Sequence, residues 1–316
     1  MLNRRYLRIK AMQSIYSFFQ SEDADLAAGE KELLRNIDRT YDLYITALIF
    51  PCELADLAAN KQEIARNKML PTQEDLNPNL KFINNRLIHK LRDSKSIQKE
   101  VSAHRIGWQS DPAIELIRKT WENIKNWDAY KIYMASSESS WAEDAELVID
   151  IFRKHVGDSD IFEQYIEEIS LHWPGDMNMA VAPALIKTCE AATEDADIKL
   201  APLYKDPEDD RQFVLDLFRK TVLDNDASSK LIGDKTKNWE VDRIAVMDVI
   251  LMQMAITELR NFPSIPVKVT LNEYIEISKT YSTPKSRQFI NGILDKLVAD
   301  FREQGWINKT GRGLME

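Results

Sequence analysis

The amino-acid sequence predicts an all-α fold, because of its composition and its apolar periodicity. Glycine is scarce, with 9 among 316 residues, and helix interiors penalise glycine more than any residue except proline. Apolar residues recur at three- and four-residue spacing along most of the chain, as Leu7, Ala11 and Ile15 do near its start. No strand-like alternation is long enough to build a sheet. A hydrophobic content of 44% with 29% charged residues is typical of a folded globular protein.

Proline, glycine and asparagine residues divide the chain into expected helices. The first of these helices covers residues 3–20. Others are expected over 31–59, 80–91, 111–133, 141–156, 161–171 and 181–191. The acidic run at 206–210 is interpreted as a solvated linker. The expected organisation is a basic first helix at 1–20, an extra helical region at 21–205, a helical core at 206–305 and a C-terminal tail at 306–316.

Two further helices are expected in the last third of the chain. Thr270 and Glu273 have the spacing of a capping box, in which the first side chain accepts from an amide three residues on and the second reaches back. Thr283 and Pro284 are expected to begin the next helix as its N-cap and first helical residue. Both helices would belong to the helical core.

An internal echo appears when the chain is shifted by 66 residues. Residues 148–154 then align with 214–220, and 11 of the 29 positions from 148 to 176 match. Two pairs extend the match: Trp173 with Trp239, and Asp176 with Asp242. Two amphipathic helices of similar composition would account for part of this match, whereas the coincident pairs favour a duplicated helical unit.

The sequence holds no pattern that indicates an enzyme. The four histidines and two cysteines show no metal-ligand spacing, and no catalytic or phosphate-binding motif occurs. We therefore expect no catalytic residue, no metal and no cofactor. The start of the chain lacks the apolar stretch of a signal peptide, and the most apolar later segment, 244–256, is too short to span a bilayer. A cytoplasmic protein without a membrane partner is expected.

Two cationic clusters indicate an anionic partner despite a net charge of −9. Arg4, Arg5 and Arg8 share neighbouring faces of the first helix. Cations oppose the positive end of the helix macrodipole there, which a bound anion would relieve. The second cluster combines hydroxyls, two cations and a helix start: Ser282, Thr283, Lys285, Ser286 and Arg287. We predict that both clusters share one exposed face. Phe289 could stack on a base or pack inward, and its spacing favours packing.

Four segments resemble the NusB family. Residues 266–279 match the family's "P…V…NE.IE..K" helix, and residues 286–296 match the "S..F.NG.LD" helix that follows it. Residues 239–259 resemble a "W…R…D" helix that ends in "EL", and residues 4–16 resemble the arginine-rich first helix with its "Q..LY" element. The resemblance covers about 3–20 and 208–304, which leaves 21–205 as an extra region.

The resemblance implies a NusB-like helical bundle that binds boxA-type single-stranded leader RNA of ribosomal RNA operons. Its expected protein partners are a small-subunit ribosomal protein acting as NusE and the RNA polymerase antitermination complex. The RNA contacts that it implies fall in the two cationic clusters: Arg4, Arg5, Arg8, Lys285, Ser286 and Phe289. The partner-facing residues would be Tyr16 and Asp248. A helical protein-interaction scaffold with vestigial RNA binding is the alternative. An accessory of RNA methylation would need a glycine-rich cofactor loop, which the chain lacks.

Overall fold

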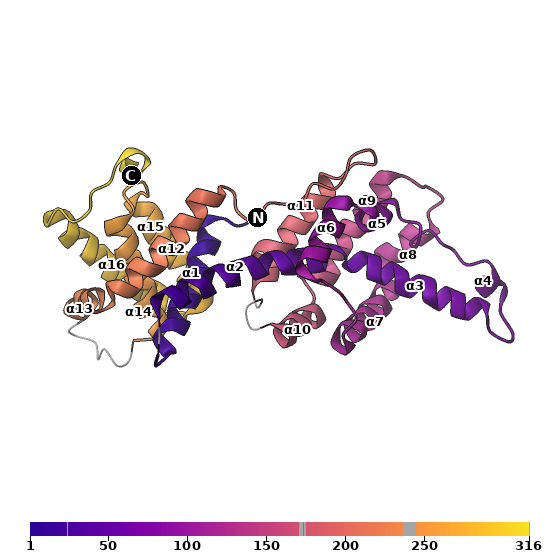
Figure 1. The fold of residues 1–316 in the computed structure, drawn as a ribbon, viewed down its shortest axis with the longest axis horizontal. Helices are drawn as coiled ribbons and strands as arrows, with labels where there is room; N and C mark the ends of the chain where they lie inside the picture. The colour runs from indigo at the N-terminus through magenta and orange to yellow at the C-terminus, as the bar shows by residue number, and fades with distance from the viewer. Residues whose placement is uncertain (24, 171–172, 174, 237–243, 316) are drawn as a thin grey trace. The chain divides into compact units, whose positions relative to one another are not determined.

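The computed structural model describes residues 1–23, 25–170, 173, 175–236 and 244–315, and all regular structure among them is helical (Figure 1). The predicted fold class is therefore confirmed. The chain divides into two units. Unit 1 comprises Met1 and Asp38–Leu203, and unit 2 comprises Leu2–Ile37 and Tyr204–Glu316. No helix in the described part of the chain is long and apolar enough to cross a membrane.

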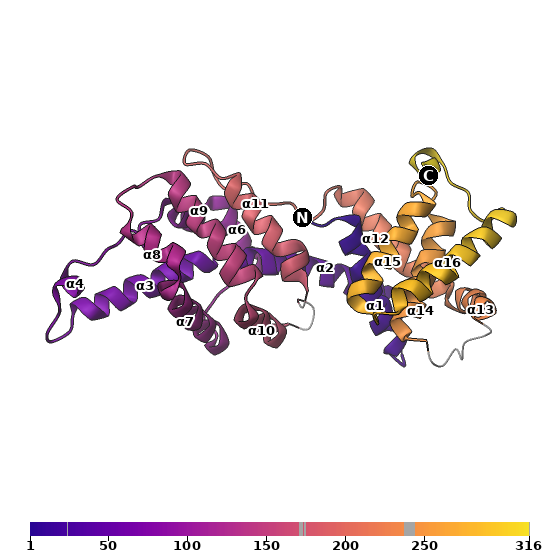
Figure 2. The same cartoon turned by 180° about the vertical axis from the view of Figure 1, so that it is seen from behind.

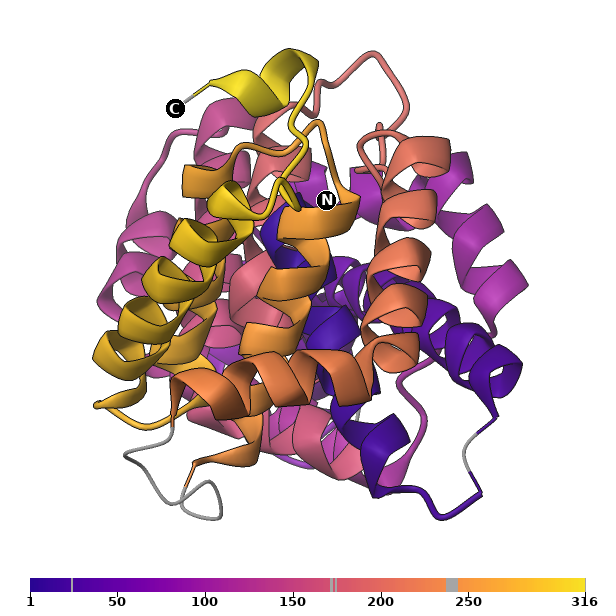
Figure 3. The same ribbon diagram turned by 90° about the vertical axis from the view of Figure 1, so that its left-hand side faces the viewer.

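Unit 2 is built around one central helix, α14 (Val246–Asn261), from which every residue between Ile250 and Leu259 is buried. A helix that is buried on all sides needs neighbours on all sides. These neighbours are α1 (Arg4–Gln20), α12 (Pro207–Leu223), α13 (Asn225–Lys235), α15 (Val267–Tyr281) and α16 (Ser286–Glu303). The first part of α2 (Leu26–Leu48) and the short η4 (Gly311–Leu314) complete the unit. Figure 3 shows α15 and α16 side by side.

Helix α1 packs along α12 and also contacts α14 and α15. It begins where Asn3 provides an N-cap, with its side-chain oxygen accepting a hydrogen bond from the Tyr6 amide at 2.9 Å. The N-terminal helix therefore joins helices that lie some two hundred residues further along the chain. We predicted this docking from the family resemblance, and it is confirmed.

Unit 1 contains the remainder of α2 and a continuous apolar core formed mainly by its other helices (Figure 2). These helices are α3 (Phe50–Arg66), α4 (Gln73–Leu76), α5 (Arg86–Asp93), α6 (Lys95–His104), α7 (Asp111–Asn126), α8 (Asp128–Ala135), α9 (Trp141–Ile151), η1 (Phe152–Gly157), α10 (Asp160–Ile169), η2 (Met177–Val181) and α11 (Ala182–Glu190). Aromatic rings organise the core, with Trp108 stacked on Tyr165 at a ring-centroid distance of 5.4 Å.

Several expected helix limits are wrong for local reasons. The helix expected over 31–59 is two helices, because Pro51 cannot continue a helix and instead lies in the first turn of α3. The helix expected over 111–133 is interrupted at Trp127. The helix expected over 80–91 begins only after Asn85, whose side chain caps it.

Two further interpretations of polar segments are corrected. The acidic run at 206–210 is not a linker, because Asp206 caps α12 and the residues after it form its first turn. Carboxylates at that position stabilise the positive end of the helix. The capping box is also wrong, since α15 begins at Val267 and Thr270 is buried inside it.

The 66-residue echo has a structural counterpart. Helix α9 with η1 spans 141–157, and α12 spans 207–223, so the limits agree at that offset. The helices that follow, α10 and α13, agree to within one residue. Phe152 and Phe218 are both fully buried. Trp239 and Asp242 lie outside the described residues, so that half of the match stays a prediction.

Candidate nucleic-acid interface

The arginines at the start of α1 are bound by carboxylates of the same chain. Arg4 forms ion pairs with Asp209 and Asp210, and its guanidinium carbon lies 4.1 Å from the centre of the Phe213 ring. The distance from Arg4 Nε to the Asp210 carboxylate is 2.9 Å. The unfavourable position of these cations at a helix N-terminus is therefore offset from within the protein. A bound anion is not needed to explain it.

Arg5 stays at the surface. Its side chain is 44% exposed, and it donates from Nε and Nη2 to the two oxygens of Glu273, both at 2.8 Å. This paired hydrogen bond raises the pKa of Arg5, so the guanidinium remains charged. Because Nη1 takes no part in the pair, the side chain keeps donors for a phosphate.

The expectation that Arg8 belongs to an exposed cluster is wrong. Its residue exposure is 2%, and its guanidinium donates to both Glu258 oxygens at 2.7 and 2.8 Å. Thr270 Oγ1 and the Tyr274 hydroxyl donate to the same carboxylate at 2.8 and 3.2 Å. Burial alone would lower the pKa of Arg8, but the Glu258 carboxylate raises it overall. Arg8 therefore ties α1 to α14 and does not reach solvent.

The second predicted cluster is only partly accessible. Lys285 and Arg287 are exposed at the start of α16, and Phe289 is half-buried. Ser286 is 2% exposed, and its hydroxyl accepts from the Thr283 amide at 3.2 Å. The predicted role of Ser286 in binding RNA is corrected to a structural one, because its oxygen serves the turn before the helix. That helix begins at Ser286, two residues later than expected.

Helix α15 lies between the two clusters. The pKa of the Glu276 carboxyl on this helix is lowered, first by its hydrogen bond to Lys279 and then by the charges of Arg5 and Arg287. Arg5 and Arg287 belong to different clusters and act on one carboxylate. The accessible part of the predicted site is therefore Arg4, Arg5, Lys285 and Arg287 around α15, with Phe289 at its edge.

The two residues predicted to face a protein partner have different environments. Tyr16 is 42% exposed on α1 and is available to a partner. Asp248 is 4% exposed, and its carboxylate accepts from the Ser282 hydroxyl. The prediction for Asp248 is therefore wrong, since the residue anchors the chain just before α16.

Sequence reasoning missed the carboxylates that hold the arginines. Glu258 and Glu273 both lie in the segments on which the family resemblance rests, and Asp210 lies in the acidic run interpreted as a linker. Their signal is one acid for each arginine in a first helix that itself holds none. No group of His, Cys, Asp or Glu that could hold a metal occurs among the described residues. Trp239 and Arg243, part of the resemblance, lie outside them.

The comparisons with known proteins agree with this arrangement. The model of the NusB family matches residues 190–299. The chain is 46% identical over 114 residues to the transcription antitermination protein NusB of Salinibacter ruber, an alignment that covers 36% of this chain and 71% of the relative. Identity to the proteins of the same name is 37% over 106 residues for Chloroherpeton thalassium and 36% over 97 residues for Koribacter versatilis. Those alignments cover 34% and 30% of this chain, and 50% and 66% of the relatives.

No solved structure matches this chain. The sequence relatives nevertheless settle its class, because one of them is aligned over more than two thirds of its length at high identity. The chain belongs to the NusB family, a family of transcription antitermination factors and not of enzymes.

Proposed function

We propose that this protein binds single-stranded boxA-type leader RNA of ribosomal RNA operons. In this proposal it acts with a small-subunit ribosomal protein in the role of NusE, within the RNA polymerase antitermination complex. The observation that carries the proposal is the meeting of two cationic segments, about 280 residues apart in sequence, on one α15 carboxylate: Arg5 and Arg287 both lower the pKa of Glu276.

The expected RNA surface consists of the accessible cations Arg4, Arg5, Lys285 and Arg287. Lys285 and Arg287 flank the exposed start of α16, where backbone amides of the first turn also point outward. Cations that follow a strand of phosphates give affinity without sequence selectivity. Phe289 is half-buried, so a base stacked on its exposed edge would add to this affinity.

The paired arginines and the other cations contribute differently to this surface. Arg4 and Arg5 already face carboxylates, so an arriving phosphate shares or displaces Asp209, Asp210 or Glu273. Lys285 and Arg287 lie beside one acidic neighbour, Glu276, which also binds Lys279. We infer that Lys285 and Arg287 supply the larger share of the phosphate contacts.

The test is a fluorescence anisotropy titration of a boxA-like RNA and a scrambled RNA, with and without the ribosomal protein. In the Lys285→Ala and Arg287→Ala double variant we expect weaker binding, with a salt dependence flattened by about 0.7 for each lost phosphate contact on a single strand. Lys268→Ala, an exposed lysine in the first turn of α15, is the control for loss of charge alone.

Wild-type affinity in the double variant would remove this surface from the proposal. Equal affinity for the two RNAs in the presence of the ribosomal protein would contradict boxA selectivity. Tight binding of the ribosomal protein without any RNA affinity would favour the interaction scaffold instead.

A further inference from the structure

Helix α5 of unit 1 and helix α1 of unit 2 begin in the same way. In each, an asparagine provides the N-cap: Asn85 accepts from the amide three residues on at 3.1 Å, and Asn3 does so at 2.9 Å. In each, the next residue is an arginine, Arg86 or Arg4, in the first helical position. The basic helix of unit 2 therefore has a counterpart in the extra region.

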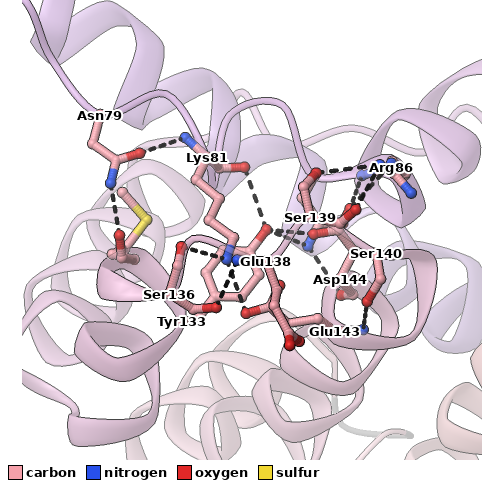
Figure 4. Close-up of polar contacts among 12 residues, drawn as sticks. Asn79, Lys81, Arg86, Tyr133, Ser136, Glu138, Ser139, Ser140, Glu143 and Asp144 are labelled. Atoms are coloured by element: carbon pink, nitrogen blue, oxygen red, sulfur yellow. Dashed lines mark hydrogen bonds and ion pairs between the residues drawn. The ribbon is translucent and has the colours of Figure 1, made fainter.

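Each of these helices packs on one member of the repeated pair. Helix α5 contacts α9, and α1 contacts α12. The fourth residue of each partner helix is a buried aspartate, Asp144 in one and Asp210 in the other, 66 residues apart. Arg4 Nε lies 2.9 Å from Asp210, and Arg86 Nε lies 3.9 Å from Asp144. The Arg86 amide also donates to Asp144 at 3.0 Å (Figure 4).

The two basic helices differ in what they expose. Five and seven residues after the asparagine cap, α1 carries Arg8 and Lys10, whereas α5 carries Lys90 and Arg92. Arg8 and Lys10 are 2% and 1% exposed. Lys90 and Arg92 are both partly exposed. In unit 1, the cations of the repeated pattern are therefore presented to solvent.

A hollow of about 720 Å³ opens beside these cations. Arg86, Lys90, Asn84 and Trp141 contribute to its walls, so it combines two cations, an amide and an indole. Arg86 Nη2 donates to the Ser139 carbonyl at 2.9 Å, which holds the guanidinium at the rim (Figure 4). Cations placed beside an aromatic face are what a nucleotide needs, since one group binds the phosphate and the other stacks on the base.

An acidic group of the same chain already occupies this position. Glu194 Oε1 lies 3.2 Å from Arg86 Nη1, and the Glu194 backbone carbonyl accepts from Lys90 Nζ at 2.7 Å. Both side chains of the ion pair are about half exposed, at 43% and 51%. An exposed pair of this kind contributes little to stability. A phosphate, which carries more charge and more acceptor oxygens, can therefore displace the carboxylate.

We propose that this pocket binds a nucleotide of single-stranded RNA, so that unit 1 supplies a second RNA contact outside the boxA-binding surface. RNA as the ligand rests on the proposed function, whereas the phosphate and base chemistry rests on the pocket itself. Residues 81–105, which include α5 and α6, hold seven lysines and arginines against two acids in a chain of net charge −9. A cationic track therefore continues from the pocket along this segment.

The test compares a boxA-like RNA with the same RNA extended by uridines at its 5′ or its 3′ end, using the full chain. We expect one extension to tighten binding. Lys90→Ala should reduce this gain and flatten its salt dependence by about 0.7. Trp141→Ala should reduce the gain on the order of 10-fold. Glu194→Gln should increase it, because the competing charge is removed while the shape is kept.

Lys119→Ala on α7 is the matched control, because it removes an exposed positive charge of unit 1 that does not line the pocket. Stronger binding by Glu194→Gln is the decisive result, since a folding defect cannot produce it. Extended RNA that binds no better than the short RNA, or variants that leave the gain unchanged, would overturn the proposal. Failure of the proposed function looks different: the boxA-like and scrambled RNAs would bind alike, while the gain from uridines would still depend on Lys90.

Discussion

Replacing Arg8 by methionine should destabilise unit 2 without removing an RNA contact. The substitution keeps an unbranched apolar side chain but removes the cation that faces Glu258. The carboxylate would keep the hydroxyls of Thr270 and Tyr274 as donors, yet it would be buried without a counter-charge. Breaking a buried ion pair in this way costs about 3–5 kcal/mol. For a protein of this size, that corresponds to a fall in Tm of roughly 6–20 °C.

Two further variants make the reasoning specific. The double variant Arg8→Met and Glu258→Met removes both charges, and we expect it to recover most of the lost stability because no unpaired charge remains. Arg5→Met is the matched control, since the Arg5–Glu273 pair is largely exposed and its loss should cost at most about 1 kcal/mol.

The assay is thermal unfolding of the full chain, with hydrogen exchange on peptides from α1, α14 and α15 to locate the change. RNA affinity is measured in parallel at a temperature where each variant is folded. Unchanged unfolding in the Arg8→Met variant, together with weakened RNA binding, would refute the structural role of Arg8 and return it to the RNA surface.

Three other outcomes follow from buried groups. Burial lowers the pKa of His155 to about 4, so the folded chain keeps it neutral while the unfolded chain protonates it below about 6.5. Unfolding free energy should therefore fall, by up to about 1.4 kcal/mol per pH unit, as pH drops from 6.5 towards 4, and His155→Phe should flatten this slope in urea titrations. Gly313→Ala should loosen the C-terminal segment by about 1–3 kcal/mol, seen as faster hydrogen exchange there, because a Cβ would lie 1.9 Å from the Pro263 carbonyl oxygen. Burial raises the pKa of Cys52 and Cys189 to about 12, so a thiol reagent at neutral pH should label neither until the chain unfolds, and rapid labelling of the folded protein would contradict their burial.

The helical class followed from the sequence because periodicity and composition act over many residues at once. Helix limits followed less well, because they depend on single residues whose effect is local. Pro51 interrupts an apolar pattern that otherwise runs on without a break. Thr270 has the right spacing for a cap, yet its hydroxyl is used by the buried Glu258, a contact between helices that local spacing does not reveal.

The candidate site shows a similar division. The sequence located both cationic segments, because charge asymmetry is visible along the chain. It did not distinguish Arg8 from Arg5, which lies three residues earlier on the same helix. The difference arises from tertiary partners, since Glu258 approaches from the central helix and Glu273 from a surface helix.

The net acidity of the chain is compatible with RNA binding because much of its negative charge is already matched. Asp210 and Glu258 are buried carboxylates that hold arginines of α1, and Asp144 holds the start of α5. Charges matched within the fold contribute little to the field at the surface, since each pair presents a dipole instead of a net charge. The field that an RNA meets is set by exposed cations such as Lys285 and Lys90. Association with RNA therefore depends on where those few cations lie, and the total charge says little about it.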